Sequence, residues 1–185
     1  AAQPNGAPNP SSVRVGFAEQ LNLYEVCGLL LGANLAPSEQ VGELLECVLK
    51  PPLDQLQQLC ADSLAGTSAT SSAVSPLVMS GTNASAAESE ALFASRAELA
   101  AHCISVVAVV SKGFSNLSAA TALSNGSGLP RAAFVHAMRL ALASLQPFGR
   151  SADVRAKALM LLHRMVETLS EDLVAFLNPA LPQLL

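Results

Sequence analysis

Residues 151–185 read SADVRAKALMLLHRMVETLSEDLVAFLNPALPQLL and form the stretch that decides the fold. In its first half, residues recur at the spacings of three and four that place them on one side of a helix with about 3.6 residues per turn. They are Val154, Ala158, Leu161, Met165 and the pair Thr168 and Leu169. The sequence therefore predicts an amphipathic helix whose apolar stripe needs a partner.

A second helical segment is expected directly after this helix. Ser170 can cap it, Glu171 and Asp172 carry the negative charge that a helix N-terminus favours, and Asn178–Pro179 is typical of another helix start. The pattern then stops at Leu185 before a second helix is complete. A hairpin of this kind indicates a piece of a longer stack of helical pairs, in which each pair buries its apolar side on the next.

The composition favours an all-α fold. Of the 185 residues 51% are hydrophobic, with no Trp and one Tyr, and Ala, Leu and Val dominate. No signal peptide is visible, and the longest apolar runs, 26–33 and 103–110, are shorter than the roughly 20 residues of a membrane helix, so we expect a soluble chain. The net charge of -4 disfavours a broad nucleic-acid surface without excluding a local basic patch.

The chain divides into five predicted segments. Residues 1–12 combine Pro, Asn and Gly and should be flexible, residues 13–60 form a first helical repeat, and residues 61–87 form a disordered insertion of small, uncharged residues. Residues 88–149 form a second repeat and residues 150–185 a truncated third. Within the first repeat, Lys50–Pro51–Pro52 is expected to kink or break the second helix, because proline removes a donor and clashes with the preceding turn.

No pattern of an active site is present, so we expect neither catalysis nor a cofactor. The usual nucleophile and phosphate-loop motifs are missing. His102 and Cys103 are adjacent, which turns their side chains about 100 degrees apart on a helix. The four cysteines lie far apart without metal-site spacing, so we expect no bound metal and interpret them as buried thiols: Cys27, Cys47, Cys60 and Cys103.

Basic residues near the end of the chain are the candidate binding residues. Lys157 and Arg164 share one polar stripe and lie about 10 Å apart along the helix axis, a separation that could bridge phosphates. The same stripe offers ordinary pairing of Lys157 with Asp153 and of Arg164 with Glu167, and both uses stay open. Further candidates for contact with a nucleic-acid backbone are Arg150, Arg139 and Arg131.

Three stretches resemble a known family. Val154-Arg155-x-x-Ala158 resembles the V-R-x-x-A signature of HEAT repeats, and 162–165 with Leu177-Asn178-Pro179 resembles exportin-T, the tRNA exportin of the karyopherin-β group. Residues 23–30 resemble the Leu-Phe-Glu-x-x-Gly-x-Leu-Ile helix of that family, and residues 111–116 resemble its Ser-Lys-x-Phe-Ser run. The resemblance implies a HEAT-repeat α-solenoid fragment of antiparallel helix pairs stacked side by side. It also implies that Arg155 links neighbouring repeats through an acidic partner.

The same resemblance implies a function. A protein of this family would shuttle between nucleus and cytoplasm, carry tRNA together with Ran-GTP, and meet nuclear pore proteins but no membrane. The protein would act by coupled binding of its partners and not by catalysis. Ran would be bound mainly by other repeats of the full-length protein. The helical pattern alone equally supports a HEAT-repeat scaffold that binds proteins, or a karyopherin with protein cargo.

Overall fold

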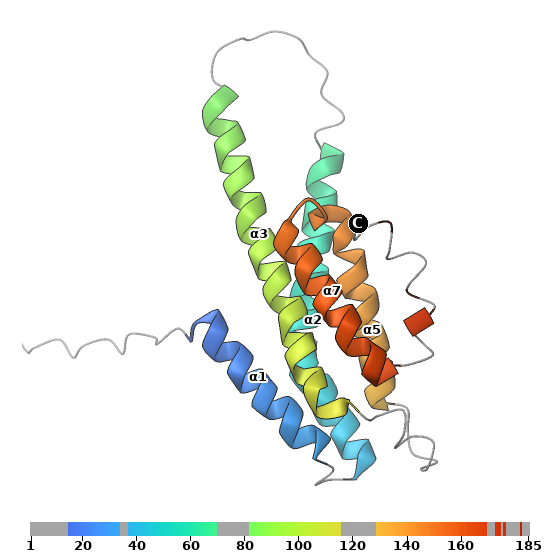
Figure 1. Ribbon diagram of the computed structural model, residues 1–185. Helices are drawn as coiled ribbons and strands as arrows, with labels where there is room; N and C mark the ends of the chain where they lie inside the picture. The colour runs from blue at the N-terminus through green and yellow to red at the C-terminus, as the bar shows by residue number, and fades with distance from the viewer. Residues whose placement is uncertain are drawn as a thin grey trace, which may run out of the picture.

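A computed structural model of the protein consists of helices joined by turns in every segment that it describes (Figure 1). The described residues are 15–33, 37–69, 82–115 and 129–169, with 173, 174, 176 and 182. The elements are α1 (Phe17–Gly32), α2 (Ser38–Ala69), α3 (Thr82–Val110), the 3₁₀ turn η2 (Ser111–Phe114), α5 (Leu129–Ala143), α6 (Leu145–Phe148) and α7 (Ala152–Leu169). No strand occurs in these residues, which confirms the all-α prediction.

The long helices lie in two layers. In the first layer α1 packs against α3 and α3 packs against α7, while in the second layer α2 packs against α5. Figure 1 shows the three helices of the first layer running in one direction and the two of the second layer running in the opposite direction. Contacts of α3 with α2 and of α7 with α5 join the layers. Successive long helices therefore alternate between the layers.

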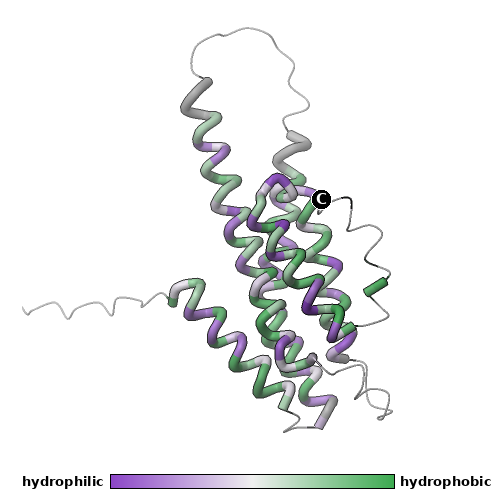
Figure 2. Tube along the Cα trace, viewed as in Figure 1, coloured by the Kyte–Doolittle hydropathy of each residue, from purple (hydrophilic) through white to green (hydrophobic). Residues whose placement is uncertain are grey.

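The hydrophobic core lies between these layers. The side chains of Leu45, Ile104, Phe134 and Leu161 are fully enclosed, and each comes from a different long helix. The Phe114 ring stands edge-on to the Phe134 ring, with 5.3 Å between the ring centroids. The stripe predicted within residues 151–169 is buried along α7: Val154, Ala158, Leu161, Met165, Thr168 and Leu169. Figure 2 shows hydrophobic residues alternating with hydrophilic ones along this helix. That prediction is confirmed.

Glycine allows α1 to approach the end of α3 backbone to backbone. A Cβ atom added at Gly28 would lie 2.7 Å from the Cα atom of Val110 and 2.9 Å from its carbonyl carbon. One turn later, a Cβ atom at Gly32 would overlap the backbone of Gly113. Only residues without a side chain fit here, so these glycines set the distance between α1 and α3.

Helix α2 continues through its two prolines. The helix is unbroken from Ser38 to Ala69, with Pro51 and Pro52 inside it, so the break expected at Lys50–Pro52 does not occur. The missing amide hydrogens leave two carbonyl groups of the preceding turn without their helical donors. Pro52 and its neighbours Leu49 and Leu53 are buried. The packing of this apolar stripe against α3 and α5 compensates for the lost hydrogen bonds.

The predicted insertion at residues 61–87 is too wide. Helix α2 extends into it as far as Ala69, and α3 begins at Thr82, before the expected start at Glu88. Alanine is frequent in both flanks and has the highest helix propensity, which favours continuation of helices that the core already anchors. Residues 70–81 lie outside the described residues, as do residues 1–12 and most of the segment after Leu169.

One helix meets the length and composition of a membrane span. The stretch Ala86–Phe114 has a mean hydropathy of 1.5 in its most apolar window, and 56% of that window is buried inside the protein. The continuous apolar runs in the sequence are shorter than this span, because charged residues interrupt the first part of the helix. Helix α3 packs against α1, α2 and α7, so burial within the protein also accounts for its apolar surface.

Candidate nucleic-acid interface

Lys157 and Arg164 lie on the same side of α7, as the spacing predicted. Both residues are half-buried at the edge of the apolar stripe, so their aliphatic stems are covered while their charged ends reach the surface. Lys157 forms no ion pair within the described residues, although Asp153 lies one turn before it. The Lys157–Asp153 pairing that the sequence left open does not form, and the ammonium group of Lys157 is available to an anion.

The guanidinium group of Arg164 is only weakly engaged. Its Nη1 atom lies 3.8 Å from the Oε2 atom of Glu167, which is the pairing that the sequence allowed. The Nε atom of Arg164 is buried and has no hydrogen-bond partner. Because Nε is enclosed, an external phosphate or carboxylate could reach this guanidinium group only at its Nη atoms.

Arg150 is occupied by contacts within the protein. Its Nη2 atom lies 3.0 Å from the Oε2 atom of Glu90, and its guanidinium carbon lies 3.5 Å from the centre of the Phe93 ring. Both partners belong to α3, so Arg150 fastens the turn between α6 and α7 to that helix. No sequence pattern indicates this role, because the partners lie some sixty residues earlier and only the fold brings them together.

Arg155 has a structural contact, but a different one from that expected. Its Nη1 atom donates a hydrogen bond to the carbonyl oxygen of Gly149 across the turn that precedes α7. Within the described residues no carboxylate pairs with Arg155, so the acidic partner is replaced by a backbone acceptor. The carbonyl oxygen of Gly149 lies in the turn, where no helical amide group donates to it. The side chain of Arg155 supplies the missing hydrogen bond. The contact still joins the two neighbouring helical segments.

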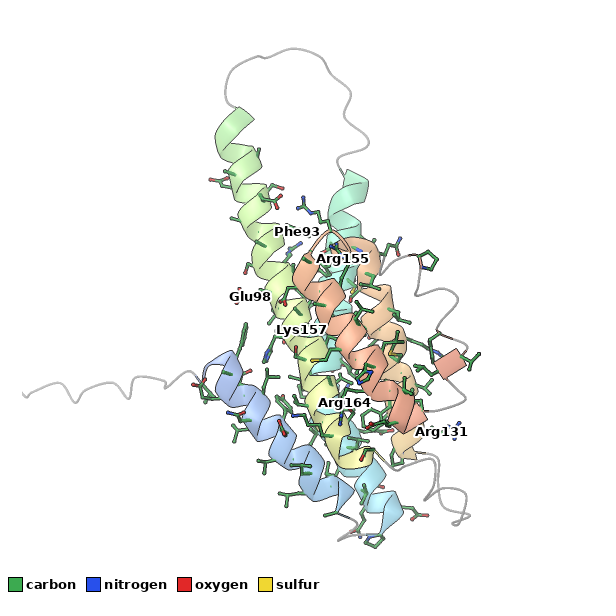
Figure 3. All side chains as sticks on the ribbon, in the orientation of Figure 1. Phe93, Glu98, Arg131, Arg155, Lys157 and Arg164 are labelled. Carbon is green, nitrogen blue, oxygen red and sulfur yellow. The ribbon has the colours of Figure 1, made fainter. Side chains whose placement is uncertain are left out.

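Arg139 and Arg131 come from α5 in the second layer. Arg139 is exposed and lines a groove of about 580 Å³ together with Leu142, Leu145 and Phe176. Arg131 is half-buried and takes part in an interaction within the protein. In Figure 3, Arg131 lies near the start of α5, whereas Lys157 and Arg164 lie along α7. The five candidate residues therefore do not form one patch, and only Lys157 and Arg164 share a helix side.

The surface of α2 carries the opposite charge. Its exposed side chains include five carboxylates and one lysine, whose Nζ atom pairs with an oxygen of Asp54 at 3.0 Å. The carboxylates belong to Glu39, Glu43, Glu46, Asp54 and Asp62. This surface would repel phosphate groups. An anion would accordingly be favoured on the first layer, at α7, rather than along α2.

His102 and Cys103 point toward different helices. The Nε2 atom of His102 lies 3.0 Å from the Oε1 atom of Gln20 on α1, and the Cys103 thiol donates to the Oε1 atom of Gln55 on α2 at 3.5 Å. Burial raises the pKa of the Cys103 thiol to about 12. These two side chains do not form a nucleophile with its base.

The cysteines differ from the expectation of four buried thiols. Cys103 is buried and Cys60 is half-buried, but Cys27 on α1 and Cys47 on α2 are exposed. Cysteine behaves as a small apolar residue and was assigned to the core on that ground, yet the helix sides that carry Cys27 and Cys47 face away from it. Among the described residues, no three His, Cys, Asp or Glu side chains lie close enough together to hold a metal ion.

The contact of His102 with α1 predicts a dependence of stability on pH. Burial lowers the pKa of the imidazole below its usual value of 6.5, and the ring stacks on Phe17 with 4.1 Å between ring centroids. Because the folded protein prefers the neutral ring, the stability contribution is complete above pH 6.5 and declines as the pH falls below it. We expect the thermal midpoint to fall between pH 7.5 and pH 5.5 by more in the natural protein than in His102→Gln. An equal fall in both proteins would contradict this prediction.

Comparison with known proteins finds a similarity over most of the chain. The chain is 28% identical over 179 residues to Exportin-T of Dictyostelium discoideum, an alignment that covers 92% of this chain. The chain spans about 14% of the length of that relative. No family model matches the chain. No solved structure matches it either. The described residues are thus helical, and the chain is similar to part of Exportin-T.

Proposed function

We propose that the chain is part of a nuclear transport receptor that exports tRNA from the nucleus to the cytoplasm together with Ran-GTP. The alignment with Exportin-T carries this proposal, because it runs through nearly the whole chain and so includes every described helix. The receptor works by coupled binding and not by catalysis: tRNA and Ran-GTP favour the same shape of the protein, so each raises the affinity for the other. Ran-GTP and nuclear pore proteins bind other repeats of the full-length receptor.

The proposed architecture is a HEAT-repeat α-solenoid. Successive long helices alternate between the two layers, and like helices of successive pairs lie side by side in the order α1, α3, α7 and α2, α5. This arrangement is what stacked antiparallel helix pairs produce. In this arrangement α1 and α2 form a first pair, α3 and α5 form a second, and α7 belongs to a third.

Within this segment, Lys157 and Arg164 are the residues that we propose to contact the tRNA backbone. Lys157 has no ion pair within the described residues, and the Nη1 atom of Arg164 has only a long contact of 3.8 Å with Glu167. Arg139 and Arg131 are secondary candidates on the other layer, and Arg150 would first have to leave Glu90 and Phe93. Two separated charges without an aromatic platform suit the recognition of a backbone rather than of bases.

The decisive experiment is binding of mature tRNA to the full-length protein by filter retention at two salt concentrations. It is performed with and without Ran loaded with a GTP analogue that cannot be hydrolysed. We expect tRNA to be retained only in the presence of Ran, with an affinity that falls as the salt concentration rises, because phosphate contacts release counterions. Absence of tRNA binding in both conditions would overturn the proposal.

A second candidate function is a HEAT-repeat scaffold or a karyopherin with protein cargo. The exposed carboxylates of α2 favour it, since they form a surface that attracts basic proteins and repels nucleic acid. The same filter experiment separates the two functions: a protein that fails to bind tRNA would have its cargo among proteins.

A further inference from the structure

An apolar groove of about 300 Å³ lies between α2 and α5 in the second layer. Leu49 and Leu53 of α2 form its floor, with 1% and 7% of their surfaces exposed. Ala132 and Ala133 form its wall on α5, and His136 stands at the same edge. Because alanine side chains are short, they leave this space open although α2 and α5 pack together. The groove has room for an aliphatic side chain from another molecule.

The edge of the groove on α2 is negatively charged. Glu46, Lys50 and Asp54 line this edge and are exposed. Their spacing of four residues places them on one stripe, with about 12 Å along the helix axis between the first and the last. Glu39 and Glu43 are also exposed, and the helical repeat places them in the same arc of about 80 degrees. This acidic stripe carries four carboxylates and one ammonium group.

Most of the charge on the acidic stripe is not neutralised within the described residues. Asp54 pairs with Lys50 at 3.0 Å, but both side chains are exposed, and an exposed pair of this kind contributes little to stability. Glu39, Glu43 and Glu46 have no ion pair within the part of the chain that the structure describes. An apolar groove beside unpaired carboxylates attracts a cationic ligand and repels phosphate groups.

We propose that this groove is a docking site for a basic segment of another protein, bound in an extended conformation with an aliphatic side chain between two cationic ones. In an extended chain every second side chain points to the same side, and four residues span about 13 Å. This length matches the separation of about 12 Å between Glu46 and Asp54, which bind the two cations. The aliphatic side chain then enters the groove beside Ala132. The inference builds on the protein-binding function given above as the second candidate, and it does not depend on tRNA being the cargo.

Fluorescence anisotropy of a labelled peptide tests the site in the full-length protein. The probe contains Arg-Ser-Leu-Ser-Arg, and its control has glutamate in place of both arginines. We expect the basic peptide to bind at least about tenfold more tightly than the acidic one. Glu46→Gln and Asp54→Asn should each weaken its binding about threefold, because each removes one charge that faces a cation. The matched control Asp62→Asn makes the same change on α2, about 80 degrees around the helix from Asp54, and should leave the affinity unchanged.

A Lys50→Gln variant is expected to change the affinity in the opposite direction. It frees Asp54 from its present partner, so the basic peptide should bind about threefold more tightly. Damage to the fold could not produce such a gain. The inference would be overturned by equal binding of the two peptides, by an equal loss in Asp54→Asn and Asp62→Asn, or by an unchanged affinity in Lys50→Gln.

The peptide experiment is independent of the filter-binding experiment, because it contains neither tRNA nor Ran. Binding of the basic peptide without retention of tRNA would refute only the tRNA transport function. Retention of tRNA without binding of the peptide would refute only the docking site.

Discussion

Replacing Gly28 by leucine is expected to separate α1 from α3. Even a Cβ atom at this position would lie 2.7 Å from the Cα atom of Val110, and backbone atoms cannot move aside as a flexible side chain can. The remaining atoms of leucine would force the helices further apart and would expose the partly buried Leu21, Tyr24 and Leu31. We expect a loss of about 3 kcal/mol in the free energy of unfolding, measured with urea.

The matched control for this substitution is Ala18→Leu on the same helix. Ala18 is exposed, so the larger side chain meets no backbone and should change the free energy of unfolding by less than about 0.5 kcal/mol. Hydrogen exchange of the amides in α1 should accelerate in Gly28→Leu and not in Ala18→Leu. A Gly28→Leu protein as stable as the natural one would show that α1 and α3 do not meet through their backbones.

Reversing the charge of Lys157 or Arg164 is expected to weaken binding of tRNA by the full-length protein. Log affinity falls as log salt concentration rises. If each residue neutralises one phosphate, each substitution by glutamate should make this fall shallower, reducing the size of the slope by about one. The loss should be largest at low salt, where counterion release contributes most. Filter binding over a series of salt concentrations in the presence of Ran-GTP measures both quantities.

The control for these reversals is Lys50→Glu on α2. It makes the same change in net charge, but Lys50 is exposed in the second layer and already pairs with Asp54. Lys50→Glu should leave the salt slope unchanged. Circular dichroism is required for Arg164→Glu, since part of that side chain is buried. If all three variants lose affinity equally, overall charge and not the α7 side governs binding.

The sequence predicted local features that depend on periodicity. The apolar stripe of α7 was identified correctly from spacings of three and four, because a helix repeats every 3.6 residues whatever packs against it. The same geometry correctly placed Lys157 and Arg164 on one side of α7. The ends of α2 and α3 were less certain, because alanine-rich segments carry little contrast between buried and exposed positions.

The sequence by itself determined the helical class of this protein, the α7 residues that enter its core and the spacing of its candidate cations. Only the tertiary structure decided which cations remain available. Arg150 is bound by Glu90 and Phe93, and Arg155 donates a hydrogen bond to the carbonyl oxygen of Gly149. Lys157 has no ion pair within the described residues. The physical reason is that these partners lie on other elements or across a turn. Periodicity orders residues within one helix and contains no information about the neighbour that meets it.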